Sequence, residues 1–385
     1  MRVEQNISRL RHLLKLYNLS AKELSVEISK GLKNPVTEKD MFSPKIKVSH
    51  LKRIDSFFNK GLYYYLDPRD PETSKESSIF FRKDKFNSVL NIGARKIVNE
   101  FEEFKISLSA ISKLSDLKID RKIKYYRITD DPKSVAKEIR KILYPTFDKN
   151  LKEFLKALIF KFAEYNILIF EFVETWNKKD KANINGFFLN PNVIVLKRQQ
   201  ESFRREIFTL IHELGHLLLN EEEIESFDPV SMYRKNLSEV ERWCNDFAYN
   251  FLIGDYYNLM ESINNADPSN DYESEKIEKI SDNTNLSKIA LYTRLLFEKK
   301  VTQSNYNKIK TDFEENYLTI IRAKEEEKEF NKIRGIKQKG STPKAIKSPL
   351  LISTIATALY EGVITEYEVC KRLKIKPLKL SKYIS

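Results

Sequence analysis

The sequence predicts a helix-rich α+β protein, in which a small domain of helices on a short sheet is flanked by helical N- and C-terminal domains. Through most of the chain, apolar residues recur every three to four positions, as they do in amphipathic helices. Three runs, 167–173, 186–189 and 193–196, are instead rich in β-branched and aromatic residues and predict strands. An Asn-Pro-Asn turn at 190–192 predicts that the last two strands form a hairpin.

Residues 1–80 predict a helical domain. An apolar stripe predicts a first helix over 4–17. Ser20, with Glu23 three residues later, predicts the capping box that begins a second helix. Helical spacing returns over 48–66, before a segment rich in aspartate and proline ends it.

Residues 81–130 predict a helical connector, with amphipathic spacing over 83–104. The central region, 131–300, should contain two helices before the strands in sequence and two after them. These helices are expected at 131–143, 151–165, 203–219 and 240–253. The polar segment 265–287 predicts a loop built around short turns.

The last part of the chain predicts two further regions. Residues 301–347 should form a charged helix, over about 308–330, followed by a basic linker. Residues 348–385 should form a helical unit that resembles a helix-turn-helix.

Composition bounds the class of protein. With 385 residues, 41% hydrophobic and 32% charged, the chain is globular rather than collagen-like or wholly disordered. Its two cysteines cannot build a disulfide framework. The N-terminus lacks the apolar region of a signal peptide, and no apolar run is long enough to span a bilayer. We therefore expect a cytoplasmic protein without a membrane partner.

Positive charge is concentrated at the two ends of the chain. Residues 1–60 hold 13 Lys and Arg and 6 Asp and Glu, a net charge of +7. Residues 331–385 hold 12 Lys and Arg and 3 Glu, a net charge of +9, whereas the net charge of the whole chain is +13. The ends could therefore contact a polyanion such as DNA, because Lys and Arg release counterions from phosphates. The alternative is that the basic surface only confers solubility.

The motif with the clearest chemistry is His212-Glu213-Leu214-Gly215-His216, an HExxH sequence in a predicted helix. Residues four apart share a helical face, so His212 and His216 can bind one ion, with Glu213 beside it as general base. Zn²⁺ suits two imidazoles and a carboxylate that leave a fourth position for water. The alternative is a chance histidine pair, but buried histidines without a metal need other polar partners. Gly215 predicts the close approach of another backbone or a ligand.

The third ligand should be a carboxylate, because the other two histidines lie in the N-terminal region. Glu241 on the next strong helix, with Asn245 one turn later to orient a ligand histidine, fits this role. Glu239, Asp246 and the acidic cluster at 221–225 remain alternatives. Tyr249, two turns after Glu241, is a candidate donor to the developing oxyanion.

These two segments resemble the ImmA/IrrE family of metallopeptidases. Residues 208–219 are similar to its T-L-x-H-E-x-G-H motif, and residues 241–252 to its E-x-x-A-N-x-F-A-x-x-L-L motif. The resemblance implies a zincin-like fold for roughly residues 130–300, Glu241 as the third zinc ligand and Asn245 as its companion. Cys244 departs from the family's usual alanine; it could pack as a small apolar residue or place a thiol near the zinc.

The two ends carry weaker resemblances. Residues 19–25 are similar to the L-S-x-x-E-L-A opening of an Xre-type helix-turn-helix, although the rest of that motif is not recognisable. Residues 352–375 resemble the helix-turn-helix tail of other ImmA/IrrE proteins. A general helical scaffold at the N-terminus, and a dimerisation or docking hairpin at the C-terminus, are the alternatives.

Family members act on helix-turn-helix repressors in stress responses and mobile elements. The resemblance therefore implies a zinc-dependent endopeptidase that cleaves one regulatory protein, a helix-turn-helix repressor. The 186–196 strand pair lies just before the helix with the HExxH motif, so an extended substrate segment could pair with its edge. The alternative is a DNA- or partner-binding regulator, or an antitoxin, whose zinc site is structural or vestigial. The intact Glu213 argues against this alternative, because a structural site needs no general base. The oligomeric state is not predicted.

Overall fold

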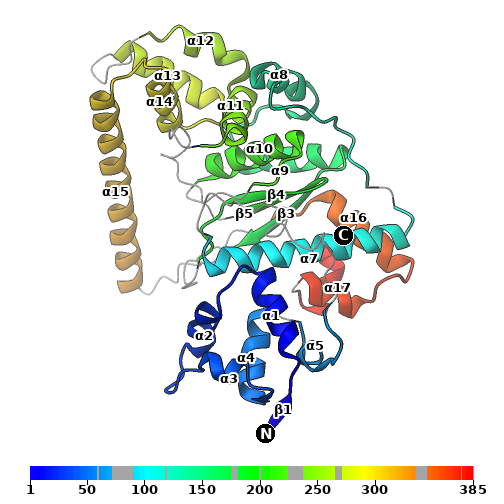
Figure 1. Ribbon diagram of the computed structural model, residues 1–385. Coiled ribbons are helices and arrows are strands. Elements are labelled where there is room, and N and C mark those ends of the chain that lie inside the picture. The colour runs from blue at the N-terminus through cyan, green and yellow to red at the C-terminus, as the bar shows by residue number, and fades with distance from the viewer. Residues whose placement is uncertain are drawn as a thin grey trace. The chain divides into compact units, whose positions relative to one another are not determined.

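The computed structural model describes residues 1–58, 60–71, 90–117, 119–174, 181–198, 202–223, 237–264, 271–334, 345–373 and 375–384 (Figure 1). The chain divides into two compact units, one formed by Met1–Ile106 with Asp180–Asn183 and the other by Ser107–Lys179 with Ile184–Ser385. Two predicted segments, the start of the connector helix at 83–89 and most of the basic linker at 335–344, lie outside the described residues.

The N-terminal unit is helical, as the apolar spacing predicts. Its elements are β1 (Arg2–Glu4), α1 (Ile7–Leu16), α2 (Ala21–Ser29), α3 (Glu38–Met41), β2 (Lys45–Lys47), α4 (Val48–Phe58), α5 (Leu62–Leu66) and the first part of α7 (Ile92–Leu114). Ser20 and Glu23 form the predicted capping box. The antiparallel pair of β1 and β2 was not predicted, because three-residue strands are too short to show alternation. The Xre-type assignment stays a prediction.

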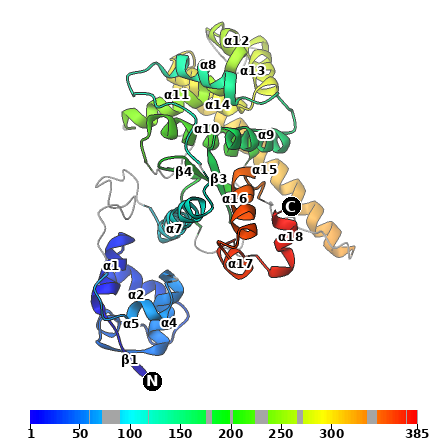
Figure 2. The ribbon, with the colours of Figure 1, turned by 90° about the vertical axis from the view of Figure 1, so that its right-hand side faces the viewer.

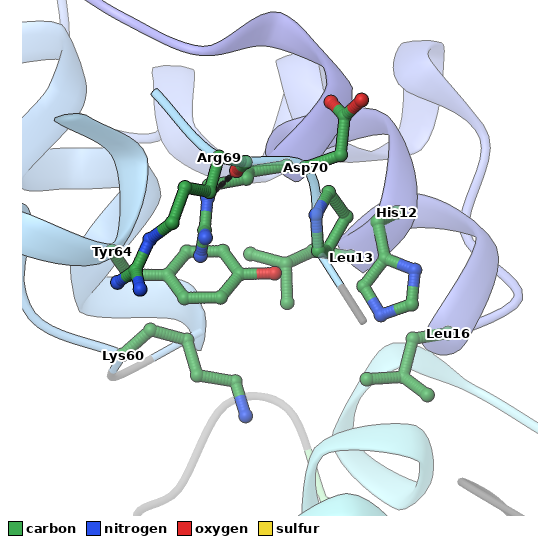
Figure 3. A pocket seen from close by; sticks show the side chains of 9 residues that line it. His12, Leu13, Leu16, Lys60, Tyr64, Arg69 and Asp70 are labelled. Atoms are coloured by element: carbon green, nitrogen blue, oxygen red, sulfur yellow. Dashed lines mark hydrogen bonds between the residues drawn. The ribbon is translucent and has the colours of Figure 1, made fainter. Parts of the chain in front are cut away.

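The N-terminal unit has a hollow of about 380 Å³, shown in Figure 3. It is lined by Arg9, His12, Leu13, Leu16, Lys60, Tyr64, Arg69, Asp70 and Pro71. Its cations have acidic partners, since Arg9 and Arg69 both pair with Asp67 and Lys60 pairs with Glu103. The hollow therefore adds little unpaired positive charge to this end of the chain.

The second unit is built on a three-stranded sheet of β3 (Leu168–Val173), β4 (Gly186–Leu189) and β5 (Val193–Arg198). The strand order is β3-β5-β4, with β3 parallel to β5 and β4 antiparallel to it. Gly186 pairs with Leu196, and Leu189 with Val193, so the predicted hairpin is confirmed. The Asn190–Pro191 peptide bond in its turn is cis.

In the described residues between 132 and 333, nine helices of this unit precede or follow the strands. They are α8 (Pro132–Leu143), α9 (Leu151–Glu164), α10 (Phe203–Leu219), α11 (Glu239–Ile253), the 3-10 helix η2 (Gly254–Tyr256), α12 (Tyr257–Glu261), α13 (Asp271–Asn283), α14 (Lys288–Phe297) and α15 (Gln303–Ile333). α10 packs on β4 and β5, and α9 packs on β3 (Figure 1). α11 packs against α10 and α8. The helix-rich α+β class is confirmed.

The predicted loop over 265–287 is wrong for most of its described part, where α13 spans Asp271–Asn283. Polar residues dominate this helix, so its hydrophobic pattern is weak. Ile277 and Ile280, three residues apart, are both fully buried in the core of the unit. Tertiary packing supplies most of the stability of a helix in a protein. Two well-buried residues can therefore stabilise a helix whose apolar periodicity is too weak to predict it.

The C-terminal residues are helical, as predicted, with α16 (Pro349–Tyr360), α17 (Glu366–Leu373), a 3-10 helix η3 (Pro377–Lys379) and α18 (Leu380–Ile384). α16 packs against α9, β3 and α18, and Figure 2 shows it beside β3. Within the described ranges, no helix combines the length and the apolar character needed to cross a bilayer.

Candidate metal centre

The site is carried by two neighbouring helices, α10 and α11. Ser202 caps the start of α10 by accepting a hydrogen bond from the Arg205 N–H, and Asn220 ends the helix in the left-handed conformation. Ser238 caps α11 in the same way, accepting from the Glu241 N–H. Both helices are apolar on their packed faces, so they bury the few polar side chains between them.

Three potential ligand atoms converge at this contact. The Nε2 atoms of His212 and His216 lie 3.2 Å apart, and the Glu241 carboxylate oxygens lie 3.2 Å from His212 Nε2 and 3.0 Å from His216 Nε2. The three residues form the group that could hold a metal ion in the described part of the chain. Bonds of about 2.0–2.1 Å to Zn²⁺ place the ligands of a tetrahedron about 3.3–3.4 Å apart. The observed separations therefore fit one tetrahedral ion.

The histidine rings differ in what holds them. His216 Nδ1 lies 3.1 Å from the carbonyl oxygen of Glu221, so Nδ1–H can donate there and leave the Nε2 lone pair for a metal. The buried Nδ1 of His212 has no hydrogen-bond partner among the described residues. Asn245 is buried one turn after Glu241, and its role as partner of a ligand histidine stays a prediction. The contact to a backbone carbonyl was not predicted, because it depends on where the chain turns after α10.

Burial shapes the charges at this site. It raises the pKa of Glu213 to about 7, against the opposing effect of the two histidines. One Glu213 oxygen, Oε2, is buried without a hydrogen-bond partner among the described residues. The pKa of Glu241 is lowered, because the two imidazoles outweigh the effect of burial. Burial raises the pKa of Cys244 to about 11, so this residue is a neutral thiol near pH 7.

Two glycines allow the elements of the site to approach closely. A Cβ at Gly215 would lie 3.0 Å from Cys244 Sγ, which confirms the predicted close approach of another backbone at this position. A Cβ at Gly186, the first residue of β4, would lie 2.7 Å from Thr209 Cγ2 and 3.1 Å from Glu213 Cγ. The close approach at Gly186 was not predicted; a glycine at a strand end is the signal that could have indicated it.

The alternative third ligands are engaged elsewhere or exposed. Asp246 pairs with Arg294 of α14. In the acidic cluster, Glu222 accepts a hydrogen bond from the Asn190 N–H at 2.7 Å, and Glu223 accepts one from the Ser238 hydroxyl at 2.9 Å. Glu239 is exposed in the first turn of α11, and Glu225 lies outside the described residues.

The candidate oxyanion donor, Tyr249, is buried in the core of the unit. The guanidinium carbon of Arg294 lies 4.7 Å from the centre of the Tyr249 ring. The role of Tyr249 in catalysis stays a prediction.

A helix with two histidines one turn apart, a glutamate between them and a second glutamate from the neighbouring helix, all over a small sheet, defines a metallopeptidase-type domain. Residues 162–295 match the family model described as the IrrE N-terminal-like domain. Both α10 and α11 lie within the matched residues, so the two helices that carry the site belong to the part of the chain that is similar to this family. No curated protein and no solved structure matches the chain.

Proposed function

We propose that this protein is a zinc-dependent endopeptidase that cleaves a regulatory protein, a helix-turn-helix transcriptional repressor, in a stress-response or mobile-element circuit. The observation that carries the proposal is the convergence of His212, His216 and Glu241 at 3.0–3.2 Å beside a buried Glu213. A structural site would have no use for this additional carboxylate.

His212 and His216 would bind the metal through Nε2, and Glu241 through its carboxylate. When bound, Zn²⁺ supplies a Lewis acid that polarises the substrate carbonyl and makes water more acidic. Glu213 acts as the general base: its carboxylate accepts a proton from the attacking water and returns it to the leaving amine. Burial raises the pKa of Glu213, and this favours its role as a group that takes up a proton and then releases it.

The substrate segment would bind in an extended form. β4 lies at one edge of the three-stranded sheet, and its first residue, Gly186, adjoins Glu213. A peptide added along this edge would run past the general base, held by main-chain hydrogen bonds. Proline substitutions along β4 that left both folding and cleavage unchanged would count against this arrangement.

The two basic ends would bring the peptidase to a repressor bound to DNA. The net excess of positive charge in residues 1–60 and 331–385 supports this part of the proposal. It predicts that the full chain binds duplex DNA and that this binding weakens steeply as salt increases. Binding that is independent of salt would contradict it.

The test compares wild type with Glu213→Gln. Both proteins are purified, their zinc is quantified, and each is incubated with a candidate repressor while mass spectrometry follows the fragments. We expect zinc in both proteins, and a fall in cleavage of roughly 10²- to 10⁴-fold in the variant. Zinc without cleavage of any candidate would favour a binding regulator or antitoxin, whereas cleavage by Glu213→Gln would contradict the assigned role of Glu213.

A further inference from the structure

A buried chain of polar contacts joins the C-terminal residues to the first turns of α10. Glu171 on β3 accepts hydrogen bonds from the backbone N–H groups of Ile346, at 2.9 Å, and Lys347, at 2.6 Å. Arg198, the last residue of β5, donates from Nη1 to Glu171 at 2.5 Å and from Nε to Glu206 at 2.8 Å. The side chains of Glu171, Arg198 and Glu206 are only 2–4% exposed.

In this series of polar contacts, each charged group depends on its neighbour for its hydrogen bonds. A charged group removed from water is tolerated only when other groups replace its lost hydration. The Arg198 guanidinium is planar and presents its donors in a rigid fork, so it holds Glu171 and Glu206 in one fixed relation. Release of Ile346 and Lys347 would remove two donors from the Glu171 carboxylate and so disturb the arrangement around Arg198.

Residues 345–384 are the last part of the second unit, and we call them the C-terminal unit. They present these two N–H groups in a specific conformation. Lys347 has φ +67°, a left-handed value that residues other than glycine rarely adopt. Such a conformation can aim successive N–H groups at one anion. Lys347 Nζ also donates to the carbonyl oxygen of Tyr383, at 3.3 Å, and lies 3.9 Å from the centre of its ring. The side chain of Lys347 therefore makes a contact of its own with α18, separate from the contact of its backbone N–H with Glu171.

At the other end of the chain of contacts, Glu206 lies near the start of the helix that carries the site. Glu213 follows it by seven residues, which is two turns and about 10 Å along the same helical face. On this face, Thr209 and Glu213 both adjoin Gly186 of β4. A shift of the first turns of α10 would therefore move the general base against the sheet.

We infer that Glu171, Arg198 and Glu206 are positioning residues, through which docking of the C-terminal unit sets the place of α10 and so of Glu213 and the two histidines. The docked unit supports the site, and its release by a partner would lower activity. The catalytic consequence rests on the proposed function, whereas the physical coupling between residues 346–347 and α10 does not.

The test uses two substitutions at one residue in the full chain. Lys347→Pro removes the N–H that Glu171 accepts, and the ring of proline forbids a φ of +67°. Lys347→Gly keeps both the N–H and the left-handed conformation and loses only the side-chain contacts to Tyr383. Glu171→Gln provides a second way to break the contact. Its matched control is Glu174→Gln, which weakens the neighbouring Lys197–Glu174 pair (3.0 Å).

Amide hydrogen exchange is measured on peptides from 345–360 and 202–211, with and without zinc, together with zinc affinity by chelator competition. In Lys347→Pro and Glu171→Gln, we expect exchange to be at least roughly tenfold faster in both peptides, as for a loss of local stability. Zinc affinity should fall in the same two variants. Lys347→Gly and Glu174→Gln should stay close to wild type in both measurements.

Two outcomes would overturn the inference. Either Lys347→Pro leaves exchange in 345–360 unchanged, or it speeds exchange there without any effect on 202–211 and on zinc affinity. If a cleaved substrate is known, the variant should lower kcat more than it raises KM, and Lys347→Gly should retain the wild-type kcat. Coupled exchange in a protein that cleaves nothing would uphold the coupling and contradict the proposed function alone.

Discussion

Gly215 of α10 and Cys244 of α11 lie in direct contact: a Cβ on Gly215 would be 3.0 Å from Cys244 Sγ and 3.2 Å from Cys244 Cα. Gly215 immediately precedes His216, and Cys244 follows Glu241 by three residues. The point of closest approach of the two helices therefore lies beside the point where their metal-binding side chains meet. The spacing between the helices sets the spacing between the ligands.

Gly215→Ala should therefore weaken metal binding. Alanine favours the helix by about 1 kcal/mol relative to glycine. Its methyl group, however, overpacks the contact between the two helices, which costs about 1–3 kcal/mol of stability. We expect the two helices to separate and the zinc affinity, measured by chelator competition, to fall about tenfold or more. Gly215→Ala combined with Cys244→Ala should recover only part of the affinity, because Cα of residue 244 stays 3.2 Å away. Wild-type affinity in Gly215→Ala would contradict this account.

Gly186→Ala should impair catalysis without affecting the metal. The new methyl group would lie 2.7 Å from Thr209 Cγ2 and 3.1 Å from Glu213 Cγ, so it displaces the general base rather than the ligands. We expect a fall in kcat of roughly 10-fold or more, from misplacement of a catalytic group, at unchanged zinc content. Thr209→Ser removes the closest atom and should restore part of kcat when it is combined with Gly186→Ala. Loss of zinc in Gly186→Ala would contradict this account, because it would show that the added methyl group disturbs the metal ligands as well as Glu213.

Metal removal should lower the thermal stability of the protein. A ligand that binds only the folded state adds about 2.7 kcal/mol when its free concentration is 100 times Kd. Calorimetry with and without zinc should therefore show a higher Tm in the presence of zinc. Glu241→Gln should lose most of this shift, whereas Glu239→Gln, an exposed position on the same helix, should keep it. Equal shifts in the two variants would exclude Glu241 as a ligand.

Gly254→Ala should destabilise the fold away from the metal centre. Gly254 ends α11 with φ +49°, and a Cβ there would lie 2.5 Å from Cζ of Arg140, which also hydrogen-bonds to the Phe251 carbonyl. We expect a loss of about 1–3 kcal/mol in the free energy of unfolding by urea, from backbone strain and the clash. Gly362→Ala is the control, because Gly362 also has a positive φ but has open space around it. Its cost should be smaller, and equal costs would show that the Arg140 contact is unimportant.

Acidification should destabilise the N-terminal unit through His12. Burial, together with Lys60, Lys15 and Arg9, lowers the pKa of His12 below its ordinary value of 6.5. The unfolded chain then binds a proton at a higher pH than the folded one, so stability falls as the pH drops through about 6.5. His12→Gln should show a shallower loss of stability between pH 7 and pH 5 in urea unfolding. If the free energy of unfolding fell equally with pH in wild type and in His12→Gln, the lowered pKa of His12 would be contradicted.

Sequence patterns predicted the elements that have strong periodicity. The helices over 203–219 and 240–253 and the hairpin over 186–196 were found at nearly their observed bounds. α13 was missed because Ile277 and Ile280 bury it without a continuous apolar stripe. The β1–β2 pair was missed because its strands lie some 40 residues apart and have only three residues each.

The place of His212, Glu213 and His216 on one turn of a helix followed from the sequence alone, because their relation depends only on the helical period. It could propose Glu241 but not place it, because the distance between two helices depends on how their side chains pack. Three contacts came from the folded structure and not from any sequence pattern: Gly215 with Cys244, the Glu221 carbonyl with His216, and the link from Ile346 and Lys347 to Glu206. Local periodicity carries no information about such contacts, since they join residues distant in the chain through burial and packing.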